Sequence, residues 1–303
     1  MFPLHIQGEI ELAAAAEANL QSGWPEAIPL RLWRQSVWYE LPYFFLPAFP
    51  SLSLPAVRPL ALFGRLFASS IFIHDPLADR GLVAHESAAS TLRIMALQFE
   101  AYRALHTVFP PDAALWDRLR GYLSDYAAAC MDELAVASGA RPWRDYREDV
   151  ALRVAVGKSG LSRAIVAGLA ELARDDGRLE PVMRALDQFN IACQMWDDLK
   201  DWRDDLEHGM PSLLLVRVLS ERPGKDEVAG AIDHVGRELY YGGHASYVLD
   251  LALAALDASD QLKRLVPELP WYRLVDVTRA KLLDTQRDLL RIIDRNVQQA
   301  RAR

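Results

Sequence analysis

Apolar residues recur at the spacing of an α-helix along most of the chain, whereas the strict alternation typical of half-buried strands is nearly absent. The clearest stripe runs from His85 through Leu92, Met95 and Phe99 to Tyr102 and marks one helix face over about five turns. Similar stripes cover Glu9–Leu20, Leu115–Val136, Val150–Leu172, Pro181–Leu206, Ala245–Leu256 and Trp271–Val297. The pattern predicts an all-α protein, a bundle of about ten helices.

Clusters of proline and glycine separate these stripes where helices would have to end. They fall at 110–112, 139–142, 175–177, 209–211, 222–224 and 267–270. No Pro/Gly/Ser-rich linker interrupts the 303 residues, so the sequence predicts a single domain covering residues 1–303.

Composition narrows the class of protein. The net charge of −7 argues against binding to nucleic acid, which needs clustered Lys and Arg. The chain start lacks the features of a signal peptide, and Cys130 and Cys193 need not pair, so we expect a cytoplasmic protein. An apolar stretch covers residues 41–63, but prolines interrupt it repeatedly, and we therefore expect no transmembrane segment.

An acidic motif lies between residues 194 and 205. At 100° per residue, its polar side chains share one helix face, where neighbouring carboxylates repel one another. The set comprises Gln194, Asp197, Asp198, Asp201 and Asp205. Such crowding suits a hard divalent cation, Mg²⁺ in particular, whose remaining ligands are water and substrate phosphate. The alternative is a solvated acidic helix end with Lys200 and Arg203 as local counter-charges.

A second pair of carboxylates, Asp75 and Asp79, stands one helical turn apart. It follows the stretch Ala61–Ile73, which is apolar almost all round and predicts a buried helix. Carboxylates at the end of a buried helix need a partner, because an uncompensated buried charge is costly. We therefore expect the two acidic motifs to converge and to hold Mg²⁺ ions around a phosphate-rich group above an apolar cavity.

A diphosphate also needs basic groups. Lys158 lies close to a predicted helix start, where free backbone N–H groups favour anions, and Arg153 precedes it by five residues. The alternative for Lys158 is an ordinary solvated lysine.

Four segments carry a resemblance to a known family. Ile73–Arg80 resembles the first aspartate-rich motif of trans-isoprenyl diphosphate synthases, and Gln194–Asp201 resembles the second. Lys158-Ser159 is similar to their diphosphate-binding Lys-Thr pair, and Gly209–Leu213 is similar to the Gly-Lys-Pro-Thr stretch that follows. The match covers about residues 60–215.

The resemblance implies the class I isoprenoid synthase fold, a single antiparallel helix bundle around a central cavity, commonly as a homodimer. It implies that a prenyl diphosphate is the substrate and that three Mg²⁺ ions are the cofactor. The metal-binding residues would be Asp75, Asp79, Asp197, Asp198 and Asp201. All of these except Asp198 would also be catalytic. The diphosphate would be bound by Lys158, Arg153, Arg80 and Gln194, the last of which would support the second motif together with Asp198.

The sequence also departs from the family pattern. Pro76 replaces the second aspartate of the first motif, only Arg80-Gly81 remains of the usual Arg-Arg-Gly, and the basic element for isopentenyl diphosphate is not recognisable near Ile28–Arg34. Elongation needs that second anionic substrate, whereas ionising one prenyl diphosphate does not. The sequence therefore favours a terpene synthase (cyclase). The alternatives are a prenyltransferase, which elongates with isopentenyl diphosphate or prenylates a small acceptor, and a non-catalytic partner subunit.

The residues before the first motif bear on substrate length. In the elongating family, bulky side chains just before the first aspartate form the pocket floor; here the corresponding residues are Ile71, Ser70 and Ser69. The small serines predict a deep pocket and a C15 or C20 substrate.

Overall fold

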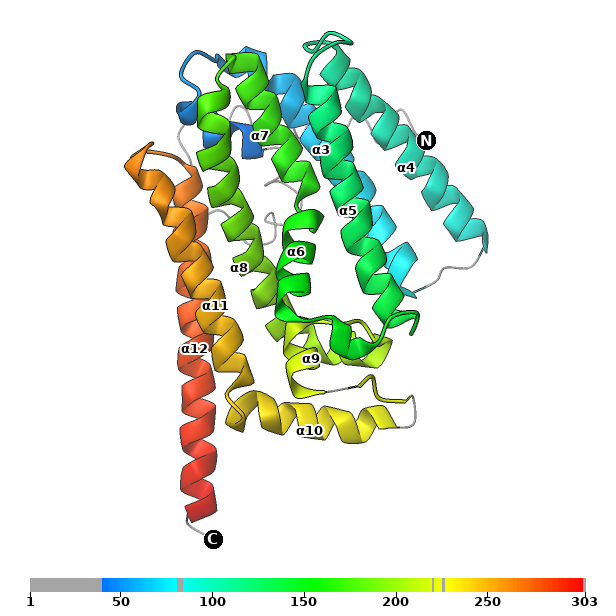
Figure 1. Cartoon of the computed structure of the whole chain (residues 1–303), viewed down its shortest axis with the longest axis vertical. Helices are drawn as coiled ribbons and strands as arrows, with labels where there is room; N and C mark the ends of the chain where they lie inside the picture. The colour runs from blue at the N-terminus through cyan, green and yellow to red at the C-terminus, as the bar shows by residue number, and fades with distance from the viewer. Residues whose placement is uncertain (1–39, 81–83, 220, 225–226, 302–303) are drawn as a thin grey trace. The chain divides into compact units, whose positions relative to one another are not determined.

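A computed structural model describes residues 40–80, 84–219, 221–224 and 227–301; of the side chains, those of residues 74–80, 84–87, 296–297 and 299–301 are not described. Every regular element in these ranges is a helix, which confirms the predicted all-α class (Figure 1). The α-helices are α3 (Leu54–Arg80), α4 (Ala84–His106), α5 (Leu115–Ala137), α6 (Glu148–Lys158), α7 (Gly160–Ala173), α8 (Asp176–His208), α9 (Leu213–Val218), α10 (Val228–Tyr241), α11 (His244–Ser259) and α12 (Trp271–Arg301). Short 3₁₀ helices occupy Leu46–Ala48, Trp143–Asp145 and Asp260–Arg264.

Most predicted helix ends agree with the structure to within a few residues, but one predicted stripe is divided. Val150–Leu172 forms two helices, α6 and α7, with Ser159 between them. The Ser159 hydroxyl donates to the Val156 carbonyl oxygen at 2.5 Å, so a side chain satisfies a carbonyl at the end of α6. The predicted helix Glu9–Leu20 lies outside the described residues.

The chain divides into two compact units, and two of the boundaries between them fall within α5 and α8. Among the described residues, the first unit contains those up to Tyr122 together with Leu161–Met183 and Glu268–Pro270. The second contains the described residues of Leu123–Gly160 and Arg184–Pro267 and those from Trp271 to Arg301. The single domain expected for residues 1–303 stays a prediction.

The first unit is built around α3. Its apolar side chains, among them Leu60, Phe63 and Phe67, are buried, as the sequence predicted for this helix. Phe63 and Phe67 lie 6.4 and 6.0 Å from the Tyr102 ring of α4, measured between ring centroids. A methyl group on Gly168 of α7 would come within 2.4 Å of Leu60, so this glycine allows α7 to pack closely on α3.

Among the described helices, α3 alone is long and apolar enough to cross a membrane, over Leu54–Ile73. Of that window 56% is buried inside the structure, as in the core helix of a globular protein. The prolines expected to interrupt this region do so only in part, because Pro55 and Pro59 lie within the first turns of α3.

The α4 helix confirms the predicted helix but turns part of its apolar stripe outward. Leu92, Met95 and Phe99 are each more than 60% exposed, whereas the opposite face buries Leu97 and Ala101. This exposed stripe belongs to the first unit.

In the second unit, α8 packs against α12 through Phe189 and Trp271, whose rings lie 4.5 Å apart. The helices α11 and α12 run side by side (Figure 1). Arg279 of α12 binds the carboxylates of Asp257 and Asp260, at 2.5 and 2.8 Å, which fixes the start of α12 against the end of α11. Neither Cys130 nor Cys193 forms a disulfide.

Candidate active site

The second acidic motif lies on α8, and its carboxylates have different environments. Asp198 is 5% exposed, and both of its oxygens are engaged. Oδ1 accepts a hydrogen bond from Gln194 Nε2 at 2.9 Å, and Oδ2 accepts one from the backbone N–H of Leu213 at 3.1 Å. Burial raises the pKa of Asp198 to about 6, although both hydrogen bonds oppose the rise. Asp198 therefore ties α8 to the start of α9.

The turn after α8 brings the Leu213 N–H to Asp198. Gly209 has a φ of +69°. Its N–H donates to the carbonyl oxygen of Leu206 at 3.2 Å, and the N–H of Met210 donates to that of Asp205 at 2.8 Å. This is a Schellman motif, which needs a left-handed residue and therefore favours glycine. Ser212 then caps α9 by accepting a hydrogen bond from the Leu215 N–H. The stretch that resembles Gly-Lys-Pro-Thr thus acts here as a support for the motif.

Asp197 and Asp201 remain accessible on α8, one turn apart. Asp201 is exposed, and Asp197 is half-exposed and binds Lys200 Nζ at 2.5 Å. The Lys200 ammonium group also lies 4.6 Å from the centre of the Trp196 ring. The Lys281 ammonium group lies 5.3 Å from the centre of the same ring. These two carboxylates of the motif can reach a ligand from solvent.

Asp205 follows on the same face of α8. Burial raises the pKa of its carboxyl group to about 8, and the negative charges of Asp198 and Asp201 add to the rise. The crowding of carboxylates that the sequence indicated is therefore electrostatically costly in the folded protein. A bound cation would reduce this cost.

Lys158, the predicted diphosphate ligand, ends α6 and is half-buried. Gly157 allows the approach of α6 to α5, because a methyl group there would lie 2.8 Å from Ala129 Cβ. Lys158 Nζ binds Glu133 Oε2 of α5 at 2.5 Å, and the Tyr146 hydroxyl donates to Glu133 Oε1 at 3.4 Å. Burial alone would lower the pKa of Lys158, but the Glu133 carboxylate outweighs it and the pKa is raised.

Glu133 was missed in the sequence. Its side chain is 8% exposed, and it contacts the predicted ligand Lys158 directly. A signal was present, because Glu133 lies four residues after Ala129 and three before Val136, on the buried face of α5. A lone acidic residue on such a face requires a partner.

Arg153, a second predicted basic ligand, is exposed on α6. Its Nη2 lies 3.6 Å from Asp132 Oδ2, so Arg153 and Lys158 contact adjacent residues of α5. The structure thus brings together Lys158, Asp198 and Gln194 within the second unit, and it pairs Lys158 and Arg153 with carboxylates of α5.

The first acidic motif lies on the last turns of α3, in the first unit. The backbone is helical through Asp75, Asp79 and Arg80, Pro76 included, but their side chains lie outside those described. Convergence of the two motifs stays a prediction. Ser70, the predicted small residue of the pocket floor, is fully buried and its hydroxyl donates to the Phe67 carbonyl oxygen at 2.7 Å.

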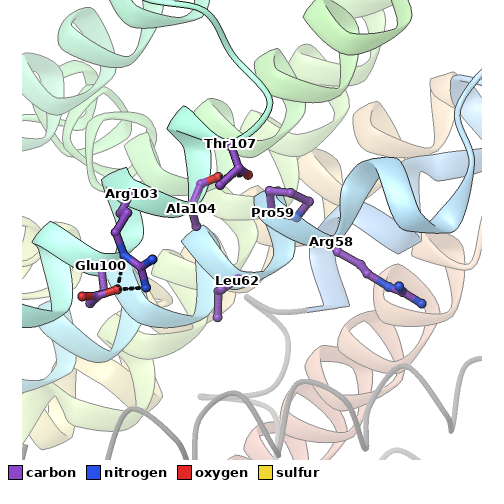
Figure 2. Close-up of a pocket in the computed structure, with 7 residues that line it drawn as sticks. All are labelled: Arg58, Pro59, Leu62, Glu100, Arg103, Ala104 and Thr107. Atoms are coloured by element: carbon purple, nitrogen blue, oxygen red, sulfur yellow. Dashed lines mark hydrogen bonds and ion pairs between the residues drawn. The ribbon is translucent and has the colours of Figure 1, made fainter. Parts of the chain in front are cut away.

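A cavity of about 220 Å³ opens between the start of α3 and the end of α4 (Figure 2). Pro59, Leu62 and Ala104 form its apolar wall, and Glu100 and Arg103 bind each other at its edge. At 1.5 Å rise per residue, Leu62 lies about 20 Å along α3 from Asp75. The cavity is therefore separate from the predicted acidic site.

No group of three His, Cys, Asp or Glu side chains that could hold a metal ion occurs within the described part of the chain. A site built from Asp197 and Asp201 would need further ligands from substrate, water or the first motif. No known protein family model matches the chain, and no curated protein matches it at a significant level.

Proposed function

We propose that the protein is a Mg²⁺-dependent terpene synthase that ionises a C15 or C20 prenyl diphosphate, converts the carbocation to a terpene and releases diphosphate. The observation that supports this proposal is that the carboxylates of the second acidic motif differ in burial and hydrogen bonding. Asp198 is buried with both oxygens bonded inside the protein, whereas Asp197 and Asp201 stay accessible one turn apart. A merely solvated acidic helix end would not need a buried carboxylate fixed from two sides.

The donor set fits Mg²⁺. Asp197 and Asp201 offer only oxygen, and a site with few protein carboxylates leaves room for water and substrate phosphate. When bound, the ion would supply Lewis-acid stabilisation of the diphosphate leaving group. Asp197 and Asp201 would hold it, and Asp75 and Asp79 would complete the site.

The remaining residues would orient the diphosphate. Lys158 would exchange part of its contact with Glu133 for a phosphate oxygen, since its three N–H donors allow both contacts. Gln194 would keep Asp198 in place through its hydrogen bond. The Lys200–Asp197 pair would open when a cation occupies the motif, because both compete for the same carboxylate.

Incubation of the full-length chain with a single prenyl diphosphate and Mg²⁺ tests the proposal. We expect a terpene hydrocarbon or alcohol and free diphosphate by mass spectrometry, and loss of product in the Asp197→Asn and Asp201→Asn variants. Glu207→Gln is the matched control, because Glu207 is an exposed carboxylate of the same helix. Absence of product from every prenyl diphosphate would refute the proposal.

The same experiment separates the alternatives. A longer diphosphate formed only with isopentenyl diphosphate would identify an elongating prenyltransferase, and a prenylated acceptor would identify a transferase of the other kind. If the chain forms no product by itself but changes the product length of an active prenyl synthase when the two are mixed, it is a partner subunit.

We further propose that the chain forms a homodimer through α4. Its exposed residues Leu92, Met95 and Phe99, with Ala96, are arranged symmetrically about the Met95–Ala96 bond. In an antiparallel pair around a two-fold axis, Leu92 of one copy would meet Phe99 of the other, as an isologous interface requires. Sedimentation analysis should show a dimer for the wild type and a monomer for Phe99→Lys; a wild-type monomer would refute this.

A further inference from the structure

A second cavity, of about 230 Å³, lies in the second unit. It forms where the connection between α5 and α6 meets the segment that follows α9. Three arginines line it, Arg141 and Arg144 from the connection and Arg222 from the later segment, together with Trp143 and Glu221. None of these residues belongs to the acidic motifs.

Each guanidinium retains donors for a ligand. Arg141 Nη1 binds Asp132 Oδ1 at 2.8 Å, and Arg222 Nη1 donates to the Ala137 carbonyl oxygen. Arg144 Nη1 lies 3.9 Å from Glu221 Oε1, and both side chains are largely exposed. An arginine has five N–H donors in a planar fork, so each of these contacts leaves most of the fork unused.

Trp143 provides an independent observation. The residue is 4% exposed, and its ring N–H has no hydrogen-bond partner in the part of the chain that the structure describes. An indole N–H can only donate, and a buried donor without an acceptor is unfavourable. The cavity wall therefore combines excess positive charge with a buried indole whose N–H lacks an acceptor.

Capping of α5 explains only part of this arrangement. Arg222 bonds the carbonyl of Ala137, the last residue of α5, as a basic side chain at a helix C-terminus often does. Within the described residues, the side chains of Arg141 and Arg144 contact carboxylates and not a helix carbonyl: Arg141 binds Asp132, and Arg144 lies 3.9 Å from Glu221. A helix cap also leaves the Trp143 N–H unexplained.

We propose that this cavity binds a small free phosphate-type anion, such as pyrophosphate or orthophosphate. Planar guanidinium forks match the oxygens of phosphate in bidentate contacts, which favours this class of ligand over a single halide. The site does not depend on the proposed terpene synthase activity. It needs no metal ion, in contrast to the acidic motif.

Isothermal titration of the full-length chain with pyrophosphate and with orthophosphate, in the presence of EDTA, tests the proposal. We expect the wild type to bind and Arg144→Gln to bind roughly tenfold more weakly, as for one lost charge-assisted contact. Arg147→Gln is the matched control: it lies in the same connection, binds Asp149 at 3.3 Å and does not line the cavity. It should bind like the wild type.

Asp197→Asn should leave binding in EDTA unchanged, which separates this site from the acidic motif. Absence of binding by the wild type, or equal affinity of the Arg144→Gln and Arg147→Gln variants, would overturn the proposal. Terpene formation without anion binding in EDTA would leave the proposed function intact and refute only this site.

Discussion

Replacing Gly209 by alanine should destabilise the protein by two separable effects. Gly209 has a φ of +69°, and an alanine in this left-handed region costs about 1–2 kcal/mol. The new methyl group would also lie 2.2 Å from Arg222 Nη2. The Arg222 side chain is flexible at this end, so it would move away and lose its hydrogen bond to the Ala137 carbonyl oxygen, a further cost of about 1 kcal/mol. We therefore expect a total loss of about 2–3 kcal/mol.

Gly243→Ala provides the control for the first effect alone. Gly243 has a φ of +78°, and no atom lies within 4 Å of the position of a new methyl group. Urea unfolding followed by far-UV circular dichroism should give a loss of about 1–2 kcal/mol for this variant. In an Arg222→Ala background, the extra cost of Gly209→Ala should disappear. Equal losses at Gly209 and Gly243 in the wild-type background, or an extra cost that persists without Arg222, would refute the reasoning.

Three further predictions concern the candidate site. The pKa of Asp198 rises from 3.8 to about 6 on folding, so its contribution to stability is fully present below pH 3.8 and is lost as the pH rises through 6. The unfolding free energy of the wild type minus that of Asp198→Asn should therefore fall by about 3 kcal/mol between these two pH values. A difference that does not change with pH would count against burial of this carboxyl group. Glu133→Gln leaves the half-buried ammonium group of Lys158 without its counter-charge. Urea unfolding at neutral pH should give an unfolding free energy about 1–3 kcal/mol lower than that of the wild type. An unchanged unfolding free energy would show that the pair is not formed. Gly157→Ala places a methyl group 2.9 Å from the Asp125 carbonyl oxygen, which is a backbone atom and cannot easily move. Thermal unfolding should show that the unfolding free energy falls by about 1–2 kcal/mol, although alanine favours a helix more than glycine does. A stabilised variant would contradict the close approach of α6 to α5.

Helical periodicity was sufficient to predict the class of the fold. The stripe from Trp271 predicts the start of α12 correctly, and Pro267–Pro270 explains why the helix begins there. The division at Ser159 was not predicted, because a hydrogen bond from a side chain to a backbone carbonyl does not alter the apolar pattern.

Periodicity also does not identify the face that a helix buries. On α4 the large residues Leu92, Met95 and Phe99 are exposed, whereas small residues such as Ala101 and Ala104 lie against the rest of the first unit. Small side chains permit a close approach of helices, and large ones can serve a contact with another molecule. A hydrophobicity pattern records both as one amphipathic helix.

Within the candidate site, the sequence placed the second motif correctly on one helix but could not separate its carboxylates. Asp198 is distinguished by the N–H of Leu213, which reaches it only because the chain reverses at Gly209. Likewise, the pairing of Lys158 with Glu133 depends on the packing of α6 on α5. Tertiary contacts of this kind leave no regular spacing in the sequence.

Pulsed electron paramagnetic resonance of bound Mn²⁺, used in place of Mg²⁺ together with pyrophosphate, tests most directly whether the two acidic motifs hold metal and diphosphate in one site. We predict phosphorus coupling to the metal in the wild type and in Glu207→Gln, and its loss both in Asp79→Asn and in Asp201→Asn. Coupling that survives either of these two substitutions unchanged would contradict a site shared by α3 and α8.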